Sequence, residues 1–156
     1  DSEFGNTEQI ALAMGNALAS QADVTTMRVN EVKPDHLTGL QLLIAGSPTQ
    51  RFRPTIATAN LLKGMPDKSL HGVKIATFDT RLTWSEISKT PVLAFFVKLY
   101  GNAYAARPMA DMLKKKGGEL IVPPEGFFVD GMKGPLSQGE LERAATWAKQ
   151  LIAKMQ

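Results

Sequence analysis

The chain has 156 residues, of which 44% are apolar and 21% charged, which is the balance of one globular domain with its own core. It contains no cysteine, and this excludes disulfides, thiolate metal sites and thiol nucleophiles, so any redox chemistry must come from a cofactor. The formal net charge is +3, but the basic residues are scattered apart from the run at 114–116, so we expect no nucleic-acid partner.

Membrane and metal sites are not expected either. No apolar run approaches the roughly 18 residues of a membrane span, and the first residues lack the pattern of a signal peptide. His36 and His71 stand in polar segments without a second ligand at metal spacing. We therefore expect a cytoplasmic protein, a monomer or weak oligomer, with no metal.

The first half of the chain alternates between helical and strand patterns. Apolar residues at helical spacing predict a helix over residues 7–18. A β-favouring run predicts a strand at 24–29, and the continuous apolar run at 40–45, ended by Gly46, predicts a strand covered on both faces. Pro54 in a first turn and Gly64 as a stop bracket a second helix.

The second half repeats this alternation. Strands are predicted at 73–78 and 119–122, and helices at 91–100 and 105–116. Residues 123–136, rich in proline and glycine, predict an extended segment or interrupted strand. Ser137 and Glu140 have the spacing of a capping box, which predicts the start of a last helix that runs nearly to the C-terminus.

Strands that alternate with helices predict an α/β fold, a single domain over residues 1–156 with a doubly wound parallel sheet and helices on both faces. A helix that follows a glycine-containing loop in such a sheet normally hangs from a central strand. That strand has no residues in this chain. We therefore expect residues before Asp1 to form it, between the strands at 24–29 and 40–45.

The loop before the first helix suits a phosphate. Residues 2–7 combine hydroxyls, a glycine and a helix start, so backbone N–H groups, the helix dipole and the side chains of Ser2 and Thr7 point to one place. The alternative is an ordinary helix cap, in which Asn6 or Thr7 satisfies only the first turn. This loop alone does not decide between the two.

Two further polar loops follow predicted strands. Residues 46–54 leave the strand at 40–45, and residues 78–84 leave the strand at 73–78. Ligands of open α/β sheets bind beyond the carboxyl ends of the strands, so the three loops are expected to meet at one rim.

In these three segments, taken in this order, the sequence resembles the flavodoxin family. Residues 1–11 are similar to the family's phosphate loop and first helix, residues 46–49 to its second flavin loop, and residues 78–81 to its third. The ending at 134–136 and 139–144 is also similar, so the resemblance covers essentially the whole chain. It implies a flavodoxin-like sheet with strand order 2-1-3-4-5, whose first strand is the one expected before Asp1.

The resemblance also implies FMN as cofactor and electron transfer as function. The first loop would hold the phosphate, the second would line the ribityl chain and ring, and the third would close the other side, with Phe52 and Trp84 as candidate stacking residues. The implied cofactor-binding residues are Ser2, Glu3, Phe4, Gly5, Asn6, Thr7, Ser47, Pro48, Thr49, Gln50, Arg51, Phe52, Asp79, Thr80, Arg81, Leu82 and Trp84.

Flavodoxins are typically acidic, whereas this chain is slightly basic and carries Arg51, Arg53 and Arg81 near the rim. Positive charge near the ring raises the flavin's reduction potential. The expected partners are redox proteins or small electron acceptors. Two other functions stay open: an FMN-dependent NAD(P)H:quinone-type oxidoreductase, and a flavodoxin-like interaction module that has lost FMN.

Overall fold

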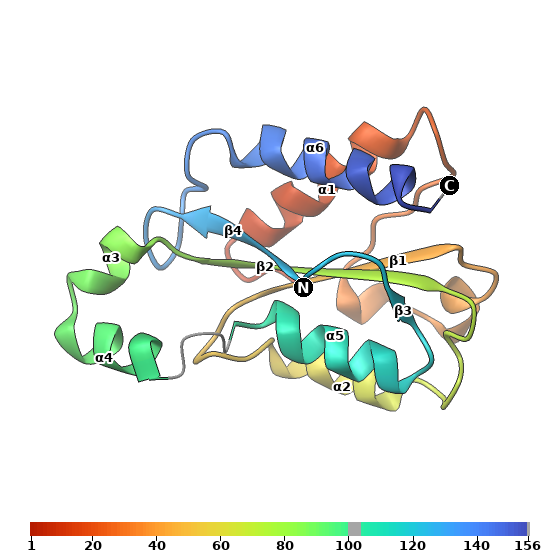
Figure 1. Ribbon diagram of the computed structural model, residues 1–156, viewed down its shortest axis with the longest axis horizontal. Coiled ribbons are helices and arrows are strands. Elements are labelled where there is room, and N and C mark those ends of the chain that lie inside the picture. Colours follow the sequence, from red (N-terminus) through yellow and green to blue (C-terminus); the bar gives the residue numbers. More distant parts are fainter. Residues whose placement is uncertain (100–103, 156) are drawn as a thin grey trace.

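The computed structural model describes residues 1–99 and 104–155 as one parallel sheet between two layers of helices (Figure 1). The strands are β1 (Leu42–Pro48), β2 (Lys74–Leu82), β3 (Glu119–Leu120) and β4 (Glu125–Val129). All of their pairings are parallel, as the predicted α/β alternation requires.

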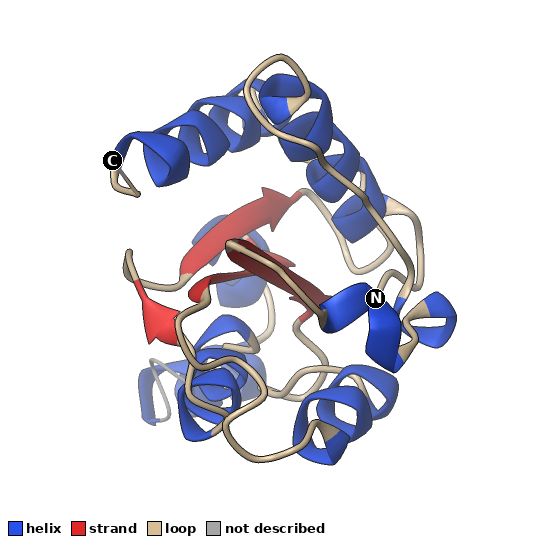
Figure 2. Ribbon diagram, turned by 90° about the vertical axis from the view of Figure 1, so that its right-hand side faces the viewer, coloured by secondary structure: helices blue, strands red, loops and turns tan. Residues whose placement is uncertain are grey.

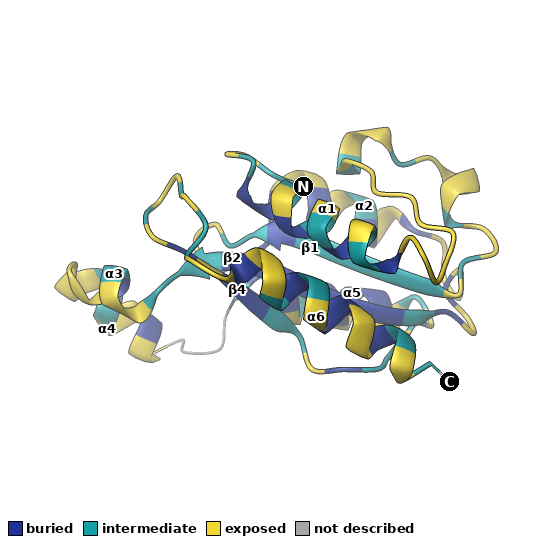
Figure 3. Cartoon of the chain, turned by 90° about the horizontal axis from the view of Figure 1, so that it is seen from above, coloured by how far each residue is buried: buried dark blue, intermediate teal, exposed yellow. Residues whose placement is uncertain are grey.

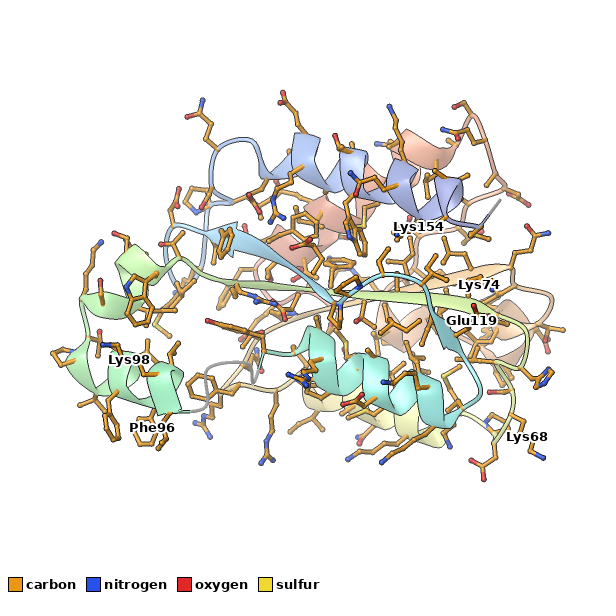
Figure 4. The ribbon with its side chains drawn as sticks, in the orientation of Figure 1. Lys68, Lys74, Phe96, Lys98, Glu119 and Lys154 are labelled. Carbon is orange, nitrogen blue, oxygen red and sulfur yellow. The ribbon has the colours of Figure 1, made fainter. Side chains whose placement is uncertain are left out.

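β2 lies at the centre of these strands. β1 pairs with one edge of β2, with Leu42 opposite Lys74, and both β3 and β4 pair with the other edge. β3 meets the first residues of β2 and β4 meets its last residues. β3 lies in the strand predicted at 119–122, and β4 lies in the segment 123–136, which is predicted to be extended or an interrupted strand. Figure 4 shows the Lys74 and Glu119 side chains near each other, and their ion pair of 2.6 Å links β2 to β3.

Helices cover both faces of the sheet, as Figure 2 shows along the strands. α1 and α6 lie on one face, and α2 and α5 on the other (Figure 1). The α-helices are α1 (Asn6–Leu18), α2 (Ile56–Gly64), α3 (Trp84–Ser88), α4 (Pro91–Leu99), α5 (Ala106–Lys115) and α6 (Glu140–Ala153). Two short 3-10 helices, η1 (Val29–Glu31) and η2 (Pro34–Leu37), precede β1.

Each face of the sheet has its own apolar core. Between the sheet and the α1–α6 layer, the rings of Phe78, Phe127 and Trp147 pack edge to face with centroids 5.8–6.5 Å apart. On the other face, Ile75 packs against Leu113 of α5 and Leu62 of α2. These two cores fix the strands in place, so the loops at the strand ends start from rigid positions.

The predicted strand at 24–29 is wrong. Residues 23–28 form no strand, and η1 begins at Val29. A β-favouring run becomes a strand only beside a neighbour with free backbone groups. This segment is mostly exposed (Figure 3), and a groove separates it from β1.

The capping box at Ser137 and Glu140 is also wrong. α6 begins after Gly139, which has a positive φ of 84° and no capping side chain. The Ser137 hydroxyl donates instead to the Asp130 carboxylate, at 2.5 Å. The Glu140 carboxylate is buried, accepts from the N–H of Phe128 at 2.8 Å and pairs with Arg143. Both side chains therefore bind other groups, and the local capping box does not form.

Most of the other predicted elements are confirmed. The helix predicted at 91–100 is α4, although Tyr100 lies outside the described residues. The short helix α3 was not predicted, and of the strand at 119–122 only the first two residues form β3. Within residues 1–99 and 104–155, no helix is both long and apolar enough to cross a membrane.

Candidate functional site

The candidate site lies at the carboxyl ends of β1 and β2, which is the end of the sheet nearest to α3 in Figure 1. Backbone and side-chain hydrogen bonds join the three predicted loops there. The N–H of Thr49 donates to the Thr80 carbonyl at 2.9 Å, which joins the second loop to the last residues of β2, in the segment predicted as the third loop. The Gln50 amide donates to the Glu3 carboxylate, which joins the second loop to the first. The convergence expected from the sequence is therefore confirmed.

The N-terminus of α1 presents backbone N–H groups without a capping side chain. Gly5 is the N-cap, and its φ of 83° is a left-handed conformation that glycine adopts without strain. Because glycine has no side chain, the first N–H groups of the helix receive no acceptor from their cap residue. Such a terminus, with its positive dipole end, is suited to an anion.

Ser2 supplies a second, independent sign of an anion at this loop. Among the described residues, its Oγ is the one buried side-chain polar atom that has no hydrogen-bond partner. An unsatisfied buried hydroxyl costs about 1–3 kcal/mol, so such atoms are rare, and a bound water or ion is one of the partners that account for them. A phosphate oxygen beside the α1 N-terminus would satisfy it.

The first turn of α1 is held in place from two sides. Thr7 is buried, and its hydroxyl lies 2.8 Å from that of Thr80 at the end of β2. The Asn6 amide donates to the carbonyl of Lys133 at 3.0 Å. Phe4 is exposed, with Lys133 over its ring. The sequence reasoning missed Lys133, which is more than a hundred residues away from this loop.

The second loop is closed by internal hydrogen bonds. Ser47 is fully buried; its hydroxyl donates to the Pro48 carbonyl and accepts from the N–H of Thr55 at 3.0 Å. The Thr49 hydroxyl accepts from the N–H of Ala105. Ser47, Pro48 and Thr49 therefore shape the loop.

The tip of this loop is a tight turn. Gln50 and Arg53 exchange both backbone hydrogen bonds at 2.9 Å, and the two residues between them, Arg51 and Phe52, have positive φ values of 47° and 65°. This is the geometry of a two-residue hairpin turn that normally favours glycine or asparagine. Non-glycine residues in this conformation are strained and occur preferentially at functional sites.

The third loop predicted at 78–84 is mostly wrong, because β2 continues to Leu82; this end of the strand contains a buried ion pair. Asp79 is fully buried and accepts two hydrogen bonds from Arg81, at 2.5 and 2.8 Å, and one from the N–H of Ala106 at 2.8 Å. Burial raises the pKa of the Asp79 carboxyl, and the hydrogen bonds and charge of Arg81 oppose that rise. The Arg81 guanidinium stacks on Tyr104, 3.8 Å from the ring centroid.

Tyr104 was also missed, because its contact with Arg81 spans 23 positions of the sequence. Leu82 ends β2 opposite Val129. Trp84, at the start of α3, is half-exposed and lies within 5.9 Å of the Lys98 ammonium.

The predicted residues thus fall into three groups by burial. One group is buried and holds the rim together: Asn6, Thr7, Ser47, Asp79 and Thr80. A second is exposed around the rim: Glu3, Phe4, Gln50, Arg51 and Trp84. The third is half-buried: Ser2, Gly5, Pro48, Thr49, Phe52, Arg81 and Leu82. Between them, the N-terminus of α1 and Ser2 Oγ offer hydrogen bonds to an anion. Within the described residues, no cluster of three or more His, Cys, Asp or Glu side chains could hold a metal ion.

No family model matches the chain, and no curated protein matches its sequence. Solved structures do match its fold. The chain is 19% identical to a flavodoxin from the domain Archaea, with a TM-score of 0.71 over 99% of this chain and 94% of that one. It is 14% identical to oxidised Flavodoxin 1 from Bacillus cereus, with a TM-score of 0.68 over 97% and 92%.

The same fold is part of larger proteins. Rubredoxin oxygen:oxidoreductase from Desulfovibrio gigas is 18% identical, with a TM-score of 0.68, over 99% of this chain but 35% of that one. At these identities the likeness establishes the fold. The chain has the flavodoxin-like fold that the sequence predicts. The full strand order 2-1-3-4-5 stays a prediction, since the sheet of the described residues has the order β1, β2 and then β3 with β4.

Proposed function

We propose that this protein binds FMN at the rim formed by its three loops and transfers electrons, as a flavodoxin does. The observation that carries the proposal is the buried hydroxyl of Ser2 without a partner, next to the uncapped N-terminus of α1. The flavodoxin-like structures to which the chain is similar support it.

The phosphate of FMN would be held by the first N–H groups of α1, by Ser2 Oγ and by Thr7. Hydrogen bonds from these groups to a dianion are charge-assisted, and each is worth about 1.5–3 kcal/mol. The Thr7 hydroxyl can donate to the phosphate while it accepts from Thr80, so their contact of 2.8 Å does not compete with this role.

The flavin ring would lie among the exposed side chains of the rim. Phe52 and Trp84 remain the candidate stacking residues, since aromatic side chains beside a flavin gain stacking energy. α4, which follows α3, also exposes apolar side chains: Val92, Phe95 and Leu99 are each more than 60% exposed. Exposed apolar surface of this kind is typical of binding faces.

Bound FMN supplies the one- or two-electron chemistry, and the chain's residues orient it and set its potential. Ser47 and Asp79 have their hydrogen bonds satisfied within the protein, so we assign them positioning roles. Arg51 and Arg53 are exposed at the loop tip and would raise the potential above that of an acidic flavodoxin. Redox partner proteins or small electron acceptors would approach this rim.

Titration of FMN fluorescence with the purified protein tests the proposal. We expect quenching at micromolar protein, and much weaker binding of riboflavin, which lacks the phosphate. Ser2→Ala should weaken FMN about tenfold or more and leave riboflavin unchanged. Ser69→Ala is the matched control, because Ser69 is exposed on a turn beyond α2.

Equal affinity for FMN and riboflavin would contradict the assignment of the phosphate to this loop. A complete lack of quenching would favour the interaction-module alternative. Oxidation of NAD(P)H with a quinone by the FMN-loaded protein would instead indicate the reductase alternative.

A further inference from the structure

Positive charge is concentrated in one part of the chain. Residues 49–116, which contain β2 and the helices α2 to α5, carry 12 Lys and Arg and 4 Asp and Glu, a net charge of +8. The remaining residues, which contain α1 and α6, carry 6 Lys and Arg and 11 Asp and Glu, a net charge of −5. Since these two pairs of helices cover opposite faces of the sheet, α2 and α5 form a basic layer and α1 and α6 an acidic layer (Figure 1).

The cations of the basic layer lie on its outer side. In α5, Leu113 is buried against the sheet, whereas Arg107 and Lys115 are exposed. Lys63 is exposed in the last turn of α2. Among residues 1–99 and 104–155, no carboxylate forms an ion pair with Lys63, Arg107 or Lys115. These three cations are therefore available to an anionic partner.

α4 turns its apolar residues to the solvent rather than to a core. Val92, Phe95 and Leu99 are 66, 62 and 61% exposed. Their spacing of three and four positions places them on one face of the helix. Val97, on the opposite face, is buried, and α4 packs against α3. Large apolar side chains that share an exposed face are typical of an interaction site.

α4 lies on the same side of the sheet as the basic layer, at one end of the molecule (Figure 1), and much of its surface is exposed (Figure 3). Figure 4 shows Phe96 on the side of α4 that is remote from α3, and Lys98 on the side that faces α3. Ile56, at the start of α2, adds an apolar side chain that is 80% exposed. One side of the molecule thus combines unpaired cations with exposed apolar side chains.

This combination matches the chemistry of an anionic lipid bilayer. Anionic headgroups attract Lys and Arg near the surface, and each such cation raises the affinity about fivefold. Aromatic and aliphatic side chains of an amphipathic helix enter the boundary between headgroups and acyl chains. α4 has nine residues and is roughly 14 Å long, less than half the thickness of the hydrocarbon core. It can therefore lie in the surface of a bilayer but not cross it.

A second copy of this chain matches the surface less well. A symmetric contact through α4 would bring together two segments of net charge +8, and like charges oppose such a contact. A bilayer carries the opposite charge, and because it is fluid it requires no matching groove for a projecting helix.

We propose that the basic layer and α4 form a docking surface for anionic lipid membranes. Val92, Phe95 and Leu99 enter the boundary between headgroups and acyl chains. Lys63, Arg107 and Lys115 contact the headgroups, and the acidic layer faces the water. Membrane docking does not depend on FMN binding.

Co-sedimentation of the FMN-free protein with vesicles tests the proposal. We expect phosphatidylcholine vesicles with about 30% phosphatidylserine to bind at least about twentyfold more tightly than pure phosphatidylcholine, and high salt to weaken this binding. Phe95→Gln together with Leu99→Gln should weaken it about a hundredfold. Leu12→Gln together with Leu141→Gln is the matched control, because it removes two exposed apolar side chains from the acidic layer. Binding by this control should be unchanged.

A second variant tests the charges independently of α4. Joint replacement of Lys63, Arg107 and Lys115 by glutamine should weaken binding to the anionic vesicles about a hundredfold, since each cation contributes about fivefold. The control replaces three exposed lysines outside the basic layer by glutamine: Lys33, Lys149 and Lys154. It removes the same charge and should weaken binding by less than about threefold, because these lysines lie further from the headgroups than the screening length of about 10 Å.

A lack of binding to either kind of vesicle, or equal binding to both, would overturn the proposal. A loss of affinity that the variants share with their controls would also overturn it. Binding to soluble polyglutamate without binding to vesicles would indicate an acidic protein partner instead. Light scattering without lipid detects self-association: a dimer that Phe95→Gln with Leu99→Gln dissociates would make α4 an interface between copies and overturn membrane docking.

Discussion

Replacement of Gly5 by valine separates the phosphate-binding role of the α1 N-terminus from its structural role. Gly5 has a φ of 83°, and an added Cβ would find only the Gln9 side chain, at 4.0 Å. The substitution therefore introduces no clash at Cβ. Its effect on folding comes from the positive φ alone, which costs a non-glycine residue about 1–2 kcal/mol.

The effect on FMN should be larger than the effect on stability. The valine side chain would stand in the open space outside the first turn, where the phosphate must approach the N–H groups. Loss of two charge-assisted hydrogen bonds corresponds to about 3 kcal/mol at the lower end of their range. FMN affinity should thus fall by roughly a hundredfold or more, and riboflavin affinity should stay unchanged.

Gly139 provides a control in the same chain. It is the N-cap of α6, with a φ of 84°, and an added Cβ would meet no atom within 4 Å. Gly139→Val should lower the free energy of unfolding as much as Gly5→Val does, without an effect on FMN. Urea unfolding of both variants and fluorescence titration with both flavins measure these quantities. Normal FMN binding by Gly5→Val, or equal weakening in both variants, would refute the reasoning.

Three further substitutions test the rim. Thr7→Ala should weaken FMN about ten- to thirtyfold, the loss of one hydroxyl hydrogen bond to the phosphate; an unchanged titration would place the hydroxyl elsewhere. Joint replacement of Arg51 and Arg53 by glutamine should lower the reduction potential of bound FMN by tens of millivolts, because positive charge stabilises the reduced anion. FMN binding should survive, and potentiometry that shows no change would mean that these side chains point away from the ring. Arg81→Met should lower the free energy of unfolding by about 3–5 kcal/mol at neutral pH, since it leaves the Asp79 carboxylate buried without its partner. Burial raises the pKa of Asp79 in the folded protein. As the pH falls, this carboxyl therefore becomes protonated at a higher pH in the folded protein than in the unfolded chain. The penalty should therefore shrink towards low pH, and a loss independent of pH would contradict this assignment.

The sequence predicted the parts of the site that depend on neighbouring residues. Gly5, Asn6 and Thr7 indicate a helix start by their types and spacing, and α1 begins at Asn6. The runs that became β1 and β2 end in polar residues, which placed the second and third loops at the carboxyl ends of these strands. Local patterns suffice for such elements because they are set by hydrogen bonds and side-chain spacing within a few residues.

The partners of individual side chains could not be predicted in this way. The pattern at Ser137 and Glu140 fits a capping box, yet Asp130 and Arg143 bind these side chains in the fold. Asp79 belongs to a segment predicted as a ligand-binding loop, but it lies in β2 and its carboxylate is buried against Arg81. Competing hydrogen bonds of similar strength are decided by which groups the fold brings together.

The sequence by itself determined the alternation of helices and strands, the flavodoxin-like fold class and the three loops of the rim. Tertiary structure alone decided that residues 24–28 form no strand, that β3 and β4 share one edge of β2, and that Ser2 Oγ is buried without a partner. The physical reason is the range of the interactions. Helix caps and apolar periodicity act between residues close in the chain, whereas strand pairing and burial depend on segments that meet only after folding.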